Sequence, residues 1–260
     1  MIYVPCRKCK KASAILGYIL EKDEDNRSWL RKCECLKKYQ ASAFLSIKMK
    51  EANLKSSMAE AAEPYNPLKD YKGHQSLDAM NKLVKYITEY DTDVFKNQSL
   101  YLYGPFNTQK TTLANWVGMN LIKKSKTVYY TMMRTLLNAL VDVSYDEDNK
   151  PEQKEIIKNA READYLILDE SFDSNKLTMY KSGYQLPFLD EFIRTRMDIQ
   201  ERPVLFISNV PIDNITDSFP MFDSLKNLLI RKIQIKGAEL TFMDDYLKCK
   251  DTFDIEDIFA

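Results

Sequence analysis

The stretch from Ser99 to Ile122 limits the possible folds most, because it predicts a strand, a loop and a helix in direct succession. Ser99–Tyr103 is a short apolar and aromatic run of the kind found in buried strands, and Leu113–Ile122 carries the apolar stripe of a helix. Between them, Gly104–Thr112 has the form of a phosphate-binding loop. We therefore predict an α/β fold with a mainly parallel sheet and helices on both of its faces.

The predicted loop supplies groups suited to a nucleoside triphosphate. Lys110 is expected to reach the β- and γ-phosphates, and Thr111 is expected to offer its hydroxyl to Mg²⁺. Gln109 stands where this type of loop has its second glycine, so its side chain either weakens binding or reshapes the loop. The other residues expected to cradle the phosphates are Gly104, Pro105, Asn107, Thr108 and Thr112.

Two later strands are predicted to end in polar residues beside this loop. Ala163–Leu168 is an apolar run followed by Asp169, which would hold magnesium, and Glu170, which would orient and polarise the attacking water. Arg202–Ser208 is followed by Asn209, an amide that could sense the γ-phosphate. The order of these elements favours a nucleotide-binding body, and an α/β sheet with an accidental Gly-to-Lys-Thr loop is the alternative.

Four of the five cysteines lie within the first 35 residues. Cys6 and Cys9 form a C-x-x-C pair, Cys33 and Cys35 form a C-x-C pair, and the 23 residues between the pairs can form a short hairpin. Four thiolates satisfy tetrahedral zinc, and a piece of about 40 residues gains from a metal the stability that its core cannot supply. We expect Zn²⁺ at these four cysteines, with two disulfides or a redox dithiol as alternatives.

Proline residues divide the chain into a head and a body. Leu36–Met58 predicts a helix, and Pro64 and Pro67 break any helix that follows it. Thr127–Thr131 predicts one further strand of the body. We assign residues 1–58 to a zinc-binding head, residues 59–70 to a linker and residues 71–260 to the nucleotide-binding body.

Charge and hydropathy limit the partners. Residues 1–60 hold 13 basic and 7 acidic side chains, so this end offers either a contact surface for nucleic acid or an acidic protein, or merely a solvated helix face. The longest apolar run falls far short of the roughly 18 to 20 residues that span a bilayer. The first residues turn polar and basic at once, unlike a signal peptide. The sequence predicts a soluble, cytoplasmic protein with no membrane partner.

On these motifs the chain resembles the DnaC/DnaI family of bacterial and phage helicase loaders within the AAA+ ATPases, which are related to the IstB transposition ATPases. The most specific part is Phe188–Asn209, a predicted helix with arginines, then Arg-Pro and an apolar strand that ends in Ser-Asn. The strand that ends in Asp169-Glu170 also resembles the family, as does the cysteine pattern around Gly17. The resemblance implies an AAA+ ATPase domain behind a zinc-binding head.

The family implies a function in the initiation of DNA replication. Such a protein binds ATP and Mg²⁺, hydrolyses ATP slowly, contacts the replicative hexameric DNA helicase through its head, and helps place that helicase on single-stranded DNA. It also assembles with copies of itself. Two alternatives stay open. A non-hydrolysing adaptor that binds the helicase is favoured by Gln109, and an IstB-like transposition ATPase is disfavoured by the zinc head.

The family also implies an arginine that completes the nucleotide site of a neighbouring subunit. Asp223–Lys232 resembles the helix that carries this residue, and we choose Arg231. Arg194 and Arg196 are rivals for the role. For Arg231, the alternative is a surface arginine that the helix dipole favours at a helix end.

Residues 173–184 follow the acidic strand and mix lysines with tyrosines. Lysines meet phosphates, and tyrosine rings stack on bases without sequence preference. An ordinary surface loop is the alternative, because the chain holds 16 tyrosines in all. The candidate contacts with single-stranded DNA are Lys176, Tyr180, Lys181 and Tyr184.

Overall fold

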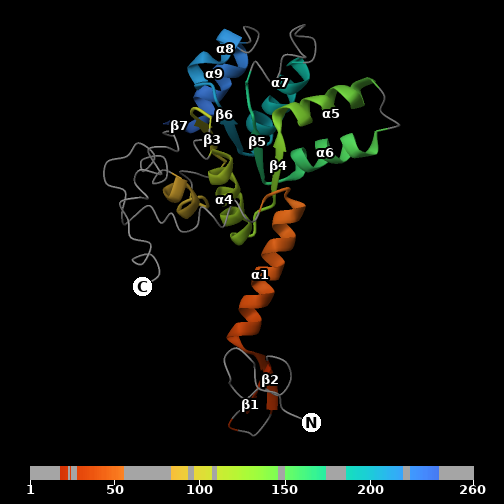
Figure 1. The fold of residues 1–260 in the computed structure, drawn as a ribbon, viewed down its shortest axis with the longest axis vertical. Helices are drawn as coiled ribbons and strands as arrows, with labels where there is room; N and C mark the ends of the chain where they lie inside the picture. Colours follow the sequence, from red (N-terminus) through yellow and green to blue (C-terminus); the bar gives the residue numbers. More distant parts are fainter. Residues whose placement is uncertain are drawn as a thin grey trace. The chain divides into compact units, whose positions relative to one another are not determined.

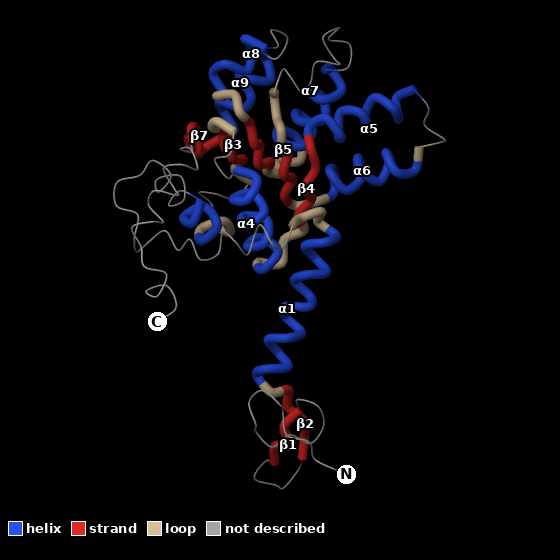
Figure 2. Tube along the Cα trace, in the orientation of Figure 1, coloured by secondary structure: helices blue, strands red, loops and turns tan. Residues whose placement is uncertain are grey.

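A computed structural model describes most of the two parts of the chain (Figure 1, Figure 2). The described residues are 18–22, 24, 28–55, 83–92, 97–106, 110–145, 150–173, 186–218 and 223–239. Two compact units meet in sequence at residue 48, namely Met1–Lys48 and Met49–Ala260. The predicted linker, residues 59–70, lies outside the described residues. Among the helices that are described, none combines the length and the apolar character needed to cross a membrane.

The first unit contains a hairpin and most of a long helix. β1 (Tyr18–Lys22) pairs antiparallel with β2 (Ser28–Lys32), which confirms the hairpin predicted between the cysteine pairs. Cys33 is buried and directly precedes α1 (Glu34–Glu51). Its Sγ accepts a hydrogen bond from the Leu36 amide at 3.4 Å, so Cys33 occupies the position of a helix N-cap.

The helix α1 ends at Glu51, seven residues before the predicted end at Met58. Asn53 adopts a left-handed backbone conformation with φ of 58°. The amide of Asn53 donates to the carbonyl of Lys50 at 3.1 Å, and the amide of Leu54 donates to that of Met49 at 2.8 Å. These two bonds form a Schellman motif, in which asparagine is one of the few residues that tolerate the left-handed position.

The residues after α1 pack within the second unit, and we call Ala52–Lys55 the helix anchor. The carbonyl of Ala52 accepts a hydrogen bond from the amide of Tyr130 at 2.8 Å. The side chain of Leu54 lies over Gly118, where an added Cβ would come within 2.7 Å of Leu54 Cδ1. Part of the segment assigned to the head from sequence, residues 49–55, therefore packs with the body.

The body is built on five parallel strands in the order β4-β5-β6-β3-β7. The phosphate loop thus leaves the sheet from a strand that has neighbours on both sides. Four of the strands match sequence predictions to within about two residues at each end, and β7 was not predicted. The strands are β3 (Ser99–Tyr103), β4 (Val128–Met132), β5 (Tyr165–Asp169), β6 (Val204–Ser208) and β7 (Ile233–Glu239).

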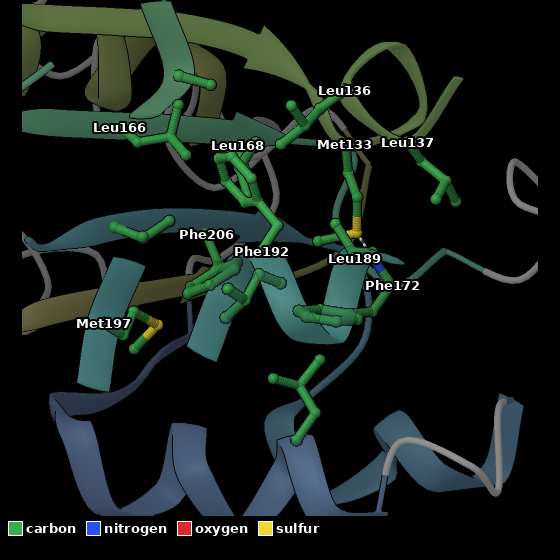
Figure 3. Packing of buried hydrophobic residues seen from close by; sticks show 14 of the residues in the cluster. Met133, Leu136, Leu137, Leu166, Leu168, Phe172, Leu189, Phe192, Met197 and Phe206 are labelled. Atoms are coloured by element: carbon green, nitrogen blue, oxygen red, sulfur yellow. Dashed lines mark hydrogen bonds between the residues drawn. The ribbon is translucent and has the colours of Figure 1, made fainter. Parts of the chain in front are cut away.

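Helices cover both faces of the sheet, as predicted. On one face α4 (Lys110–Lys123) lies so close that a Cβ on Gly118 would be 3.2 Å from Ile167 Cδ1. On the other face Leu166, Leu168 and Phe206 pack among side chains from the remaining helices (Figure 3). Those helices are α5 (Met133–Tyr145), α6 (Pro151–Glu162), α7 (Leu186–Arg194), η3 (Ile212–Asn214), α8 (Ile215–Ser218) and α9 (Asp223–Lys232).

After α7 the chain continues as a π-helix, η2 (Thr195–Ile199), that buries Arg196. The guanidinium of Arg196 donates to the carbonyls of Ala160 at 2.7 Å and Ala163 at 2.8 Å, at the end of α6. A cation at this position balances the negative end of the helix dipole. Burial lowers the pKa of Arg196 to about 9, so the group is still charged at neutral pH. Because its side chain is 1% exposed, Arg196 cannot act as an arginine finger toward another subunit.

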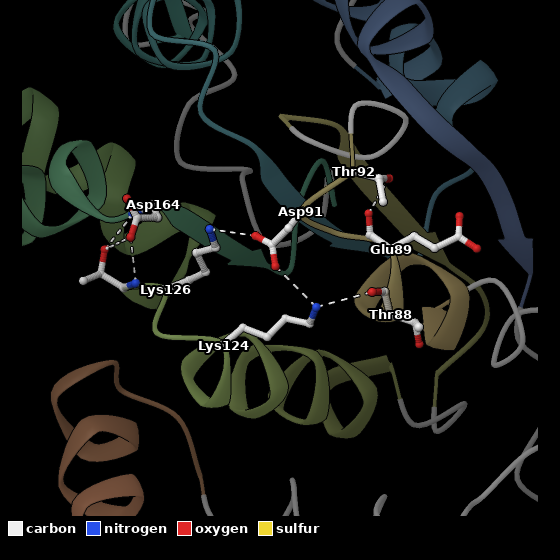
Figure 4. Close-up of polar contacts among 8 residues, drawn as sticks. Thr88, Glu89, Asp91, Thr92, Lys124, Lys126 and Asp164 are labelled. Carbon is white, nitrogen blue, oxygen red and sulfur yellow. Dashed lines mark hydrogen bonds and ion pairs between the residues drawn. The ribbon is translucent and has the colours of Figure 1, made fainter.

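The amino edge of the sheet is held by surface ion pairs (Figure 4). Asp91 lies 2.9 Å from Lys126 Nζ and 3.4 Å from Lys124 Nζ. The hydrogen bond from Lys126 is the main cause that lowers the pKa of Asp91. Nearby, Asp164 accepts hydrogen bonds from both the amide and the hydroxyl of Thr127 at 2.8 Å. These contacts tie residues 83–92 and the starts of β4 and β5 together, at the edge opposite the phosphate loop.

We predict that Leu54→Ala lowers the free energy of unfolding of the body by about 3 kcal/mol, because it opens a cavity over Gly118. Urea unfolding followed by circular dichroism measures the change. Ile199→Ala is the matched control, since Ile199 is 76% exposed and its truncation should change stability by less than about 0.5 kcal/mol. Equal effects of the two substitutions would contradict the packing described for the helix anchor.

Candidate nucleotide-binding site

The phosphate loop follows β3 directly and leads into α4. Lys110 is the first residue of α4 and is largely buried. Its Nζ donates to the carbonyls of Gly104 at 2.9 Å and Pro105 at 2.6 Å, so the ammonium lies against the start of the loop. Burial lowers the pKa of Lys110 to about 8, although the charge of Asp169 acts in the opposite direction. The amides at the start of α4 add donors suited to an anion.

The structure brings Thr111 and Asp169 together across 58 residues of sequence. Thr111 Oγ1 donates to Asp169 Oδ2 at 2.8 Å. Two oxygens in adjacent positions of octahedral Mg²⁺ lie about 2.9 Å apart, so this pair fits a magnesium ion. Thr112 follows in the first turn of α4 and is half-buried.

Tyr130 is part of this cluster, and the sequence did not reveal it. Its hydroxyl donates to the same Asp169 oxygen at 2.6 Å. Burial raises the pKa of Tyr130, and the negative charge of Asp169 raises it further, so the phenol stays protonated and remains a donor. No sequence signal marks it, because its place opposite Ile167, one diagonal step from Asp169 on the same face of the sheet, follows only from the strand pairing.

Glu170 occupies a strained turn at the end of β5. Its φ is 55°, and Phe172 two residues later has φ of 59°. The Glu170 amide donates to Asp169 Oδ1 at 2.7 Å. The Ser171 amide donates to the carbonyl of Ile207 at 2.7 Å, which ties the turn to β6. The turn therefore fixes the backbone of Glu170 relative to the carboxylate that precedes it.

Asn209 lies at the end of β6 and faces the segment that follows β5. Its Nδ2 donates to Asp173 Oδ2 at 3.2 Å. Ser208 Oγ donates to the carbonyl of Ser171 at 2.6 Å, so the ends of the two strands are joined by side chains as well as by the ladder. Asp173 is 5% exposed and was not predicted as a functional residue.

The remaining candidates are described only in part. The backbone of Arg231 lies in α9, while its side chain lies outside the described part of the chain. Arg194 forms an ion pair with Asp190 at 2.7 Å. Among the residues that the structure describes, no three His, Cys, Asp or Glu side chains gather as a metal site. Asn107, Thr108, Gln109, Cys6, Cys9, Lys176, Tyr180, Lys181 and Tyr184 lie outside the described residues.

Together these groups have the chemistry to hold a polyphosphate with a divalent cation. The ammonium of Lys110 and the N-terminus of α4 lie against the loop. The hydroxyl of Thr111 and the carboxylate of Asp169 are separated by the distance expected of two neighbouring ligands of one cation, and the carboxylate residue Glu170 follows directly. All of them lie where β3, β5 and β6 end. Open parallel sheets bind ligands at this carboxyl edge.

Comparisons with known proteins support the fold. No protein-family model matches the chain, and a search of curated proteins finds no match. The chain is similar to AMPPCP-bound DnaA from Aquifex aeolicus, with 16% identity and a TM-score of 0.52 over 75% of this chain and 59% of that one. This similarity confirms the predicted α/β fold.

Solved structures of DnaI and of the DnaC helicase loader are also among its structural neighbours. DnaI has 16% identity and a TM-score of 0.48 over 66% of this chain and 86% of that one. The DnaC helicase loader has 13% identity and a TM-score of 0.46 over 68% of this chain and 96% of that one. The fold assignment rests on the α/β fold that the chain shares with the DnaA structure.

Proposed function

We propose that this protein is an ATP-dependent loader that places a replicative hexameric DNA helicase on single-stranded DNA when replication begins. The observation that carries the ATPase part is the contact between Thr111 and Asp169 beside the buried Lys110. A DnaA structure of the same fold is bound to AMPPCP, a nucleotide analogue, which supports a nucleotide at this edge of the sheet. The loader part is supported by the resemblance of Phe188–Asn209 to DnaC/DnaI proteins.

In this proposal each residue at the edge of the sheet has one task. The ammonium of Lys110 gives up its hydrogen bonds to the carbonyls of Gly104 and Pro105 and donates instead to oxygens of the β- and γ-phosphates. Thr111 and Asp169 would hold Mg²⁺, which supplies charge neutralisation to the phosphates when it is bound. Glu170 accepts a proton from water as the water oxygen attacks the γ-phosphorus and ADP leaves. Asn209, held by Asp173, is placed to sense that phosphate.

The helix of the first unit offers a surface for a partner. On α1, Tyr39, Phe44 and Ile47 are 72%, 59% and 57% exposed. Contiguous exposed apolar surface marks interaction sites, and we propose that these three side chains belong to such a surface. These side chains support contact with the helicase through this part of the chain. Self-assembly with Arg231 acting across subunits, and DNA contact through residues 173–184, complete the proposal.

We also propose zinc in the head. Cys33 lies at the end of the hairpin and Cys35 in the first turn of α1, only two residues apart. Helix N-terminal amides favour negative charge, and thiolates are the ligands that zinc prefers. Cys6 and Cys9 would supply the other two ligands.

A helicase-binding adaptor that does not hydrolyse ATP is the second candidate. Gln109 favours it, because a side chain replaces the loop glycine at that position. Under this alternative the protein binds ATP and helicase, and turnover is the same for the wild type and for a variant without the Glu170 carboxylate.

We predict that Glu170→Gln lowers the ATPase rate about a hundredfold while ATP still binds, because the general base is lost. Lys110→Ala is expected to abolish both binding and turnover. The assay measures phosphate release with helicase and single-stranded DNA present. Lys124→Ala is the control, since its ion pair with Asp91 lies at the opposite edge of the sheet. Equal rates for all four proteins would remove the hydrolysis proposal.

The affinity for ATP should depend on the charge of Lys110. Its pKa of about 8 means that the free protein loses this proton as pH rises through 8, and binding must then restore it. Between pH 7 and pH 9 the dissociation constant of MgATP should rise roughly tenfold. Calorimetric titrations across this range measure it, and a constant affinity would show that binding of MgATP is not coupled to protonation of Lys110.

Native purified protein should contain about one zinc per chain, measured by plasma mass spectrometry. Replacing Cys33 and Cys35 together by Ser should remove it, because two thiolates cannot hold the ion against chelation. Cys249→Ser is the matched control and should keep the metal. A zinc-free native protein would refute the proposed head.

A further inference from the structure

We propose that Tyr130 is a positioning residue that orients the magnesium-binding carboxylate of Asp169, and that the helix anchor holds Tyr130 in place. This inference rests on the proposed ATPase function and deepens it. It assigns a role to a residue that neither the phosphate loop nor the acidic strand contains. It also assigns a role to the short segment that follows α1.

The contacts of Asp169 single out Tyr130. One carboxylate oxygen accepts from Thr111 at 2.8 Å and from Tyr130 at 2.6 Å, and the other accepts from the Glu170 amide at 2.7 Å. Thr111 has a second proposed task, because its hydroxyl oxygen would ligate the cation while its hydrogen still bonds to Asp169. Tyr130 has no such second task, and its bond can persist. Hydrogen-bond donors of this kind orient metal ligands from the second shell.

The backbone of Tyr130 is held from both sides. On one side Tyr130 pairs with Ile167 of β5 in the parallel ladder. On the other side β4 is the edge of the sheet, and the carbonyl of Ala52 accepts the Tyr130 amide hydrogen at 2.8 Å. The side-chain amide of Asn53 also approaches the Tyr130 carbonyl at 3.4 Å. The helix anchor therefore occupies the outer edge of the strand that carries the phenol.

The same anchor contacts the other cation ligand through α4. The Lys55 amide donates to Asn115 Oδ1 at 2.6 Å. Asn115 Nδ2 in turn donates to the carbonyl of Thr111 at 2.7 Å. Both Thr111 and Asp169 thus lie one side chain away from the helix anchor, by way of Asn115 and Tyr130. A shift of the anchor would move both ligands of the cation at once.

The first test compares Tyr130→Phe with the wild type, using a fluorescent ATP analogue. Affinity is measured in the presence of Mg²⁺ and again with the metal removed by EDTA. We expect the variant to lose roughly tenfold in affinity with Mg²⁺, as when other second-shell donors are removed, and to match the wild type in EDTA. Tyr165→Phe is the matched control, because it removes a hydroxyl from β5 at the end away from Asp169.

Four results would overturn the inference, and they differ from one another. Unchanged affinity with Mg²⁺ would show that Tyr130 does not orient Asp169. Equal losses with Mg²⁺ and in EDTA would show a general structural role. Failure of the wild type to bind the analogue would remove the proposed nucleotide site, failure to gain affinity from Mg²⁺ would remove its magnesium site, and either would remove the role of Tyr130.

The second test concerns the helix anchor. Gly118→Ala adds a methyl group that must displace Leu54 and touches none of the cation ligands. We expect a loss of Mg²⁺-dependent affinity of about threefold, smaller than that of Tyr130→Phe. In the double variant the losses should be less than additive, because both act on one orientation. Fully additive losses, or none from Gly118→Ala in a protein shown to be folded, would remove the anchor from the inference.

Discussion

The site depends on the parallel register of the four strands from β4 to β3. In that register Asp169 stands opposite Met132, Leu168 opposite Phe206, and Tyr103 opposite Ser208, so neighbouring strands end at nearly the same level. A shift of one residue in any pair would turn alternate side chains to the other face and carry Asp169 away from the loop. The buried apolar side chains on both faces oppose such a shift, because each strand has one set of residues for α4 and another for the remaining helices.

The arginines that follow α7 belong to the sequence pattern that resembles the DnaC/DnaI family, and in this structure they stabilise the fold. Arg196 is buried and donates to carbonyls at the end of α6, and Arg202 donates to those of Arg161 and Glu162 from the surface. Together they satisfy carbonyls that the helix itself leaves without partners. The Arg-Pro step is thus explained by helix capping, and the π-helix turns Arg196 inward. Arg196 and Arg202 therefore both serve the fold, the first from the interior and the second from the surface.

The sequence alone predicted the helices and strands whose signals lie in a short run of neighbouring residues. The strand before Gly104, the helix after it and the apolar strand before Asp169 each have a signature within ten residues, and all three are confirmed. The predicted end of α1 at Met58 was wrong, because no proline or glycine interrupts the helical pattern before that residue. Its true end is set by Asn53 and by the docking of Leu54 on Gly118, a contact between segments about 60 residues apart.

The part of the site that escaped prediction depends on neighbours in space. Tyr130 and Asp173 are ordinary residues in their own segments, and they become significant because β4 and β6 lie on either side of β5. A single sequence does not state that order of strands. The roles proposed for Lys110, Thr111, Asp169 and Glu170 could be anticipated because each is carried by a short motif.

The left-handed backbone of Glu170 has a consequence for how this position could change over time. A residue with a Cβ in that conformation costs about 1 kcal/mol relative to glycine, and asparagine would fit it with less strain. Selection for folding stability alone would favour glycine or asparagine at this position. A glutamate at such a place costs folding free energy, and the carboxylate task proposed for Glu170 would be the reason to keep it there.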